Sequence, residues 1–201
     1  MQLFKLRLLY VLTALSLMGC HRAESVDSTF GPVIGCILSS CSTTELQQRV
    51  KSSTDANATI PTGRTALMYA AGSGVTFSER VLRRSGKPIP STPRAEYVRI
   101  LLASGASVDA VDGEGGTALG AAIYNGNPEV VRLLLAAKSD PQKPSGSELP
   151  LQLAALHCDK EIAAMLIAAG AQVEAGDPLP PHKTAAEVAK ESDCSDVVPT
   201  P

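Results

Sequence analysis

The sequence predicts an all-α solenoid in which short helix pairs stack along one axis. The segment GRTALMYAAGSG at 63–74 is echoed by GGTALGAAIYNG at 115–126, ELPLQLAALHC at 148–158 and KTAAEVAKESD at 183–193. The tails that accompany these segments place apolar residues at i, i+3, i+4 and i+7, which is the spacing of an amphipathic helix. Aromatic residues make up only 3% of the chain and tryptophan is absent. A core of alanine and leucine must therefore form, which suits closely packed helices.

The start of each unit carries the most specific motif, a turn that resembles Thr-Pro-Leu, and paired leucines follow in the second helix. The turns are Thr65-Ala66-Leu67, Thr117-Ala118-Leu119 and Leu149-Pro150-Leu151, and the pairs are Leu101-Leu102, Leu134-Leu135 and Leu166-Ile167. With a period near 33 residues, this pattern resembles the ankyrin repeat, in which a turn is followed by two helices. The resemblance implies an ankyrin-repeat stack of about three full repeats with partial capping repeats.

The units depart from the family pattern in two ways. No unit keeps the histidine that usually follows the turn, and Met68, Gly120, Gln152 and Glu187 stand there instead. Because the family histidine ties neighbouring repeats to each other, its loss predicts modest stability. Lys138-Ser139 replaces the closing Gly-Ala of the second unit, which predicts a looser elbow there.

The first 19 residues read as a targeting segment. Two basic residues precede an apolar core of eleven, which is too short for a spanning helix of roughly 20 residues. The end of the segment, Leu17-Met18-Gly19-Cys20, resembles the lipobox of bacterial lipoproteins, which implies that Cys20 is acylated. Since His21 follows the cysteine, the resemblance implies the periplasmic side of the outer membrane, if the cell has two membranes. An ordinary secretory signal cut near Ala23 is the alternative.

We divide the chain into four parts. Residues 1–19 are the signal peptide, 20–42 the anchor and linker, 43–195 the repeat domain, and 196–201 a tail. Terminal repeats of a solenoid must present a polar face. We therefore expect a lone helix within 42–58 to cap one end of the stack, and the polar fourth unit to cap the other.

The repeat spacing is irregular at one point. Thr65 and Thr117 are 52 residues apart, whereas Thr117 and Leu149 are 32 apart, so the first repeat carries an insertion at 75–93. This insertion holds Arg80, Arg83 and Arg84 and is the most basic stretch after the signal peptide. It could bind a partner protein or anionic lipid. The alternative is a tolerated loop, because long surface loops cost little free energy.

Four cysteines remain beyond the expected lipid site. Cys36 and Cys41 lie five residues apart, close enough for a local disulfide. Cys158 and Cys194 follow equivalent helices of neighbouring repeats and can bridge if their loops lean together. Disulfides fit an oxidising compartment. A zinc site that combines these two cysteines with histidines lacks the usual Cys-x-x-Cys spacing.

No catalytic motif is visible. The chain has no Gly-x-Ser-x-Gly, no His-Glu-x-x-His and no phosphate-binding loop. A formal net charge of −2, more negative once the signal peptide is removed, argues against nucleic-acid binding. We therefore expect no enzymatic activity, no cofactor and no metal. Carboxylates near the hairpin tips form either a recognition surface or ordinary solvated turns.

The resemblance implies a concave groove that binds another protein. Gly72, Ala121 and Leu153 should line it together with larger side chains. The residues expected to contact the partner are Tyr69 and Ser73 in the first repeat, Arg80, Arg83 and Arg84 in the insertion, Asp112, Glu114, Tyr124 and Asn125 in the second repeat, and Leu156 and His157 in the third. Each apolar member could instead pack against its own hairpin.

The predicted function is that of a membrane-anchored binding module in the bacterial envelope. Small ankyrin lipoproteins of this type resemble immunity proteins that neutralise secreted antibacterial effectors, notably lipases, which implies steric blocking of the toxin's active site. The alternative is a periplasmic scaffold or protective factor for a resident envelope enzyme. In both cases we expect the chain to be monomeric when free.

Overall fold

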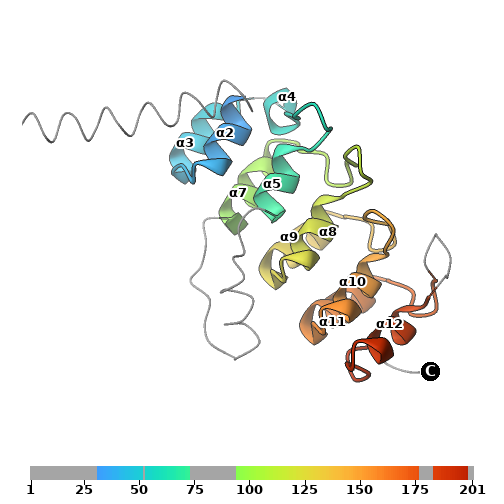
Figure 1. Ribbon diagram of the computed structural model, residues 1–201. Helices are drawn as coiled ribbons and strands as arrows, with labels where there is room; N and C mark the ends of the chain where they lie inside the picture. The colour runs from blue at the N-terminus through green and yellow to red at the C-terminus, as the bar shows by residue number, and fades with distance from the viewer. Residues whose placement is uncertain (1–30, 52, 73–93, 177–182, 199–201) are drawn as a thin grey trace, which may run out of the picture.

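The computed structural model describes residues 31–51, 53–72, 94–176 and 183–198. These residues form short helices stacked from one end of the molecule to the other, with the loops between successive units projecting on the same side (Figure 1). The helices are α2 (Pro32–Leu38), α3 (Thr43–Arg49), α4 (Ser53–Ala56), α5 (Ala66–Gly72), α7 (Arg94–Ala103), α8 (Ala118–Tyr124), α9 (Pro128–Ala136), α10 (Pro150–Leu156), α11 (Lys160–Ala168) and α12 (Ala185–Glu191). Within these ranges, β-structure is limited to isolated bridges in the hairpin loops.

The helices form two parallel rows. The inner row is α5, α8, α10 and α12, in which each helix packs against the next, and the outer row is α7, α9 and α11. Helices α5, α8 and α10 also each pack against the outer helix that follows in sequence. Helices of 7 to 10 residues are too short to be stable alone, so the stacking supplies most of their stability.

Both rows bury leucine, but the inner row buries more alanine. The inner helices bury alanine, as at Ala70, Ala122 and Ala154, whereas the outer helices bury the first leucine of each pair. Leu101, Leu134 and Leu166 each have 0% exposure. Small buried residues allow neighbouring inner helices to approach closely, as Gly72 does beside Ala121.

Side-chain caps mark where the helices begin. The Thr117 hydroxyl accepts a hydrogen bond from the backbone N–H of Gly120 at 3.0 Å, and Asp159 does the same for Ile162 at 3.1 Å. At α12 the hydroxyl of Thr184 and the carboxylate of Glu187 form a reciprocal capping box. These caps satisfy backbone donors that the first turn of a helix leaves unpaired.

A ladder of side-chain hydrogen bonds joins successive loops. Oxygens of Asn57, Asp109 and Gln142 accept from the backbone N–H groups of Ser107, Asp140 and Gln172, respectively. The sequence separations are 50, 31 and 30 residues. The longer first step agrees with an insertion of about 19 residues in the first repeat, relative to the ankyrin period. The inserted segment itself lies outside the described residues.

The elbow of the second repeat is not loosened as predicted. Lys138 takes the left-handed conformation that glycine usually provides, with φ of 68°. Ser139 is 5% exposed and donates a hydrogen bond from its hydroxyl to the Asp109 carboxylate at 2.8 Å. The serine therefore ties this elbow to the preceding loop, which the usual alanine does not do.

The expected loss of ties between repeats is also wrong at two positions. Gln152 is 1% exposed, accepts from the backbone N–H of Leu149 at 2.7 Å, and donates to the carbonyl of Lys183 in the next unit. Beside Gly120 the tie comes from the neighbouring loop, because the Ser145 hydroxyl accepts from the backbone N–H of Thr117 at 3.1 Å. A side chain at Gly120 would overlap that hydroxyl.

Both ends of the folded domain extend beyond the predicted bounds 43–195. Helix α2 lies within the expected linker, and its Val33, Ile34 and Ile37 are buried against α3 and α5. The N-terminal cap is therefore a helix pair. At the other end, Val197 and Val198 of the expected tail are buried, at 6% and 2% exposure. Apolar residues beside an open end of the stack fold onto it because they cover exposed core.

Two disulfides join the pairs that the sequence analysis proposed. Cys36 bonds to Cys41 with a Cα–Cα distance of 5.1 Å, and Cys158 bonds to Cys194 with 5.5 Å. Both distances are within the range that a disulfide requires. In the described part of the chain, no helix is long and apolar enough to span a membrane.

Candidate functional site: a cleft on the concave face

A cleft of about 290 Å³ opens between the hairpin loops and the inner helices α5, α8 and α10. It is lined by Arg64, Gly72, Gly116, Gly120, Ala121, Tyr124, Asn125, Ser145, Glu148, Leu153 and Leu156. Six of these residues were expected in the groove from the sequence: Gly72, Ala121, Tyr124, Asn125, Leu153 and Leu156. The cleft is therefore centred on the second repeat.

Small residues create the hollow. A Cβ atom at Gly72 would lie only 2.9 Å from the Cβ of Ala121, so a larger residue there would close the space between α5 and α8. At Gly116 a Cβ atom would lie only 2.9 Å from the Asp112 carboxylate, so glycine there lets the hairpin loop close around that side chain. Neighbouring loops form one side of the cleft as a continuous wall, since the N–H of Gly146 bonds to the carbonyl of Gly115 at 2.9 Å.

Two large apolar side chains face solvent beside this hollow. Tyr124 is 55% exposed and Leu156 is 48% exposed, and they occupy equivalent positions at the ends of α8 and α10. The ring of His157 packs edge-on against Tyr124, with centroids 5.1 Å apart and an angle of 83°. That contact favours one orientation of the tyrosine ring on the exposed surface.

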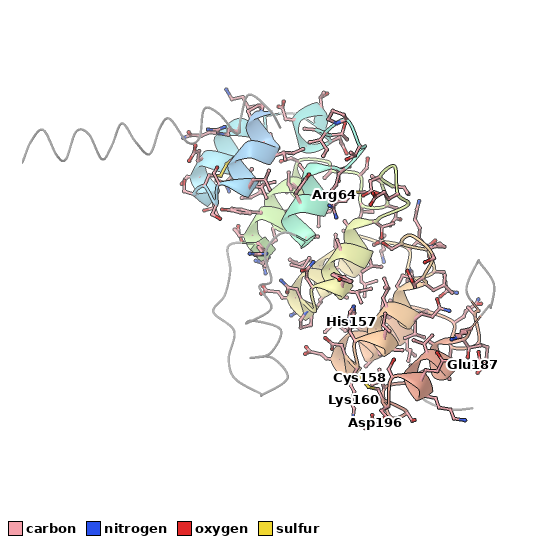
Figure 2. The ribbon with its side chains drawn as sticks, in the orientation of Figure 1. Arg64, His157, Cys158, Lys160, Glu187 and Asp196 are labelled. Carbon is pink, nitrogen blue, oxygen red and sulfur yellow. A yellow bond between two sulfur atoms is a disulfide. The ribbon has the colours of Figure 1, made fainter. Side chains whose placement is uncertain are left out.

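Arg64 borders the cleft on the side of the first repeat. Its guanidinium lies 5.5 Å from the centroid of the Tyr69 ring, and its Nε is 3.9 Å from a carboxylate oxygen of Asp112. Figure 2 shows the labelled Arg64 at the base of the loops. Tyr69 is half-buried under this arginine, so it supports the cleft and does not line it.

Asp112 has a structural task that the sequence analysis did not foresee. One oxygen of its carboxylate accepts from the backbone N–H groups of Glu114 and Gly116, at 3.0 and 2.7 Å. Only 9% of the side chain is exposed. Asp112 therefore shapes the hairpin loop, whereas Glu114 is exposed at its tip. Asn125 likewise donates to the carbonyl of Ala121 at 2.8 Å, which uses its amide within α8.

Three side chains that line the cleft were not predicted from the sequence: Arg64, Ser145 and Glu148. Arg64, Gly116 and Glu148 each stand one residue before the turn that starts an inner helix. That shared register is the signal that could have found them. Glu148 is half-buried, and among the described residues its carboxylate makes no ion pair.

The groove ends at the C-terminal cap. Lys183 occupies the register position of Glu148 in the fourth unit, and Glu191 occupies that of Leu156. The ammonium of Lys183 and the carboxylate of Glu191 are 2.6 Å apart, so an ion pair spans the concave face there. The accessible part of the groove therefore covers the first three repeats.

Several predicted site residues lie outside the described residues. These are the lipid site Cys20 together with Ser73, Arg80, Arg83 and Arg84. In the ranges that the structure describes, no group of three or more His, Cys, Asp or Glu side chains could hold a metal ion. Cys158 and Cys194, the cysteines of the alternative zinc site, are joined to each other (Figure 2).

The predicted all-α ankyrin-repeat stack is confirmed by comparison with known families. Residues 91–177 match the family model described as ankyrin repeats, with three copies. The matched range starts within the insertion and leaves out α5, although α5 stands in the same inner row as α8 and α10. No curated protein matches the chain. Ankyrin repeats generally mediate binding between proteins and are usually non-enzymatic, which fits an open cleft with exposed apolar side chains.

Proposed function

We propose that this chain is a lipid-anchored ankyrin module of the bacterial envelope that binds and neutralises another protein. The main support for a binding surface is that Tyr124 and Leu156 are both exposed beside the cleft. Large apolar groups of this kind, near the centre of a concave surface, are typical binding hot spots. Both side chains stand on packed helices, so little ordering entropy is lost when a partner binds.

The periplasm is the proposed compartment. Two disulfides in a small domain favour an oxidising environment, because cytosolic thiols are kept reduced. The lipobox at Cys20 would supply the anchor, and more than one acyl chain is needed for stable attachment. A Cys20→Ala variant should move from the membrane fraction to the soluble periplasmic fraction and lose the mass of the lipid. An unchanged distribution would contradict the anchor without affecting the groove.

The proposed partner is a secreted antibacterial effector, with a lipase as the leading candidate. A rigid concave surface suits steric inhibition, in which the module covers the entrance of an active site and takes no part in chemistry. The module would act in the compartment where such a toxin attacks the membrane. The alternative partner is a resident envelope enzyme that the same surface protects, and the experiment must distinguish the two.

The test is affinity capture with the protein tagged at its C-terminus, from cells that express the neighbouring genes. Proteins that remain after a high-salt wash are identified by mass spectrometry. A Tyr124→Ala/Leu156→Ala variant should lose the partner, whereas Leu38→Ala should keep it. Leu38 is 38% exposed on α2, away from the groove, and therefore controls for removing an exposed leucine.

A captured secreted hydrolase, whose toxicity is relieved by co-expression of the wild-type chain but not of the groove variant, would support immunity. A constitutive host enzyme in its place would identify a protective scaffold. If both variants capture the same proteins as the wild type, the groove is not the binding surface and the proposed function is wrong.

A further inference from the structure

The charges that line the cleft indicate the sign of the charge that its occupant must have, an inference that rests on the proposed function. Two charged side chains line the cleft, Arg64 and Glu148. Arg64 already has the Asp112 carboxylate at 3.9 Å and the Tyr69 ring at 5.5 Å. Glu148 has no ion pair within the described ranges, although it is half-buried. The uncompensated charge of the cleft is therefore negative.

The backbone of a second acidic residue lies close to Glu148. Glu114 is exposed at the tip of the neighbouring loop, and its backbone carbonyl and the Glu148 carboxylate both lie 4.0 Å from the position that a Cβ atom on Gly146 would occupy. The two acidic residues thus border the same part of the loop wall. The apolar side chains Tyr124 and Leu156 form the opposite side of the cleft.

The volume of the cleft limits the size of the apolar group that a partner can insert. A volume of about 290 Å³ is at the lower limit for pockets that enclose whole small molecules. Because it is open to solvent beside Tyr124 and Leu156, the cleft suits a large side chain inserted from a partner protein. Tyr124 also offers the face of an aromatic ring, which attracts a cation that lies over it.

We propose that the cleft binds a protein segment that inserts one large apolar side chain between Tyr124 and Leu156 and places a lysine or arginine next to it, against Glu148. The basic group compensates the unpaired carboxylate, and its aliphatic stem covers apolar surface as it passes. Acidic segments and anionic lipid headgroups are disfavoured, because they would bring negative charge to Glu148 and Glu114. The residues that line the cleft belong to the first three repeats, so the segment lies across those repeats.

The test starts with a library of random twelve-residue peptides displayed on phage and selected on the immobilised full chain. We expect enriched peptides to combine a large apolar residue with a lysine or arginine within three positions of it. A synthetic version of the leading peptide, and one in which its basic residue is replaced by glutamate, are then compared by fluorescence anisotropy. The glutamate version should bind roughly tenfold more weakly, as expected for loss of a charge-assisted contact.

Variants of the protein identify the contact. Glu148→Lys should reverse the preference, so that the glutamate peptide binds better than the basic one, and Glu148→Gln should reduce the difference between them. Glu161→Lys makes the same charge change at an exposed site on α11 and should leave the preference unchanged. The melting temperature of each variant shows whether it is folded. If Glu148→Lys does not fold, the comparison with Glu148→Gln decides.

The possible failures are distinct. Enriched peptides that lack a basic residue, a preference that Glu148→Gln leaves intact, or no enrichment at all would overturn the proposed occupant. Binding that is also insensitive to Tyr124→Ala/Leu156→Ala would instead overturn the groove and with it the proposed function. A concentration-dependent dimer that Tyr124→Ala abolishes would show that a second copy of the chain is the occupant, and would likewise contradict the proposal.

Discussion

The two ends of the stack close the same kind of core by different means. At the N-terminal end, α2 and α3 form a helix pair in which α2 buries Val33, Ile34 and Ile37. At the C-terminal end, α12 has no partner helix and buries only Ala185 and Ala189. Apolar burial contributes roughly 25 cal/mol per Å², so α12 itself contributes less than α2, and the buried Val197 and Val198 that follow it supply part of the core at that end.

The two ends also differ in how their disulfides attach them to the rest of the stack. The Cys36–Cys41 bond spans 5 residues within the N-terminal cap, whereas the Cys158–Cys194 bond spans 36 residues and joins the C-terminal cap to the third repeat. Each cap also receives one buried side-chain hydrogen bond from its neighbour. Tyr97 donates to the carbonyl of Cys41, and Gln152 donates to the carbonyl of Lys183. A cap with little core of its own is thus held by links to its neighbour.

The largest expected effect is on the C-terminal disulfide. Cys158→Ala/Cys194→Ala should lower the free energy of opening α12 by about 4 kcal/mol, because the bond closes a long loop in the unfolded chain. In this variant, the rate of hydrogen exchange should increase much more in residues 183–198 than in α8. Equal protection of α12 in the variant and the wild type would show that the cap does not depend on the bond.

Removal of the buried amide should have the next largest effect. Gln152→Ala leaves the N–H of Leu149 and the carbonyl of Lys183 without their partner and opens a cavity, so we expect a loss of about 3 kcal/mol. Urea denaturation measures this loss, and Gln142→Ala is the control because it removes one exposed hydrogen bond between loops. A similar loss in both variants would contradict a special role for Gln152.

The local disulfide should matter less than the long-range one. Cys36→Ala/Cys41→Ala should cost about 2 kcal/mol, since a short loop loses less entropy when it is closed. The same denaturation experiment compares it with Cys158→Ala/Cys194→Ala. If the N-terminal pair proved the more costly to remove, the apolar burial by α2 would not be what holds that end.

Tyr97→Phe tests the hydrogen bond at the N-terminal end alone. The ring stays buried, but the carbonyl of Cys41 loses its donor, and we expect a loss of about 1 kcal/mol. Burial raises the pKa of Tyr97 above its ordinary value, with opposing influence from Arg94 and a further rise from Glu45. The neutral phenol is therefore favoured in the folded state. The difference between wild type and variant should persist up to the ordinary pKa and shrink at higher pH.

The smallest effect is expected at the surface of the C-terminal cap. Lys160 pairs with Asp196 close to Cys158 (Figure 2), and its hydrogen bond lowers the pKa of Asp196 below the ordinary value of 3.8. The pair therefore contributes above that ordinary pKa and is lost as the pH falls through the lowered one. Asp196→Asn should shift the melting temperature less than any variant above, and the shift should vanish in strong acid. Raising the salt concentration should also reduce it.

The sequence by itself determined the repeat period and the helix pairs of the repeats, and it made two disulfides plausible, whose pairing the structure then decided. These features depend on spacing along the chain: apolar residues at helical period, turn motifs about 33 residues apart, and cysteines after equivalent helices. Tyr124 and Leu156 could also be named as groove residues, because a repeat register carries a position from one unit to the next.

Only the tertiary structure decided how the units are joined and what the cleft carries. Gln152 and Ser139 looked like departures from a family pattern, yet each bonds to a residue about 30 positions away that only the stack brings near. Asp112 looked available for a partner, but its own hairpin loop uses the carboxylate. Helix α2 gave no repeat signal, and its apolar residues are explained by the open end of the stack that they cover. A side chain's partners across repeats depend on the packing of the backbone, which a one-dimensional pattern does not contain.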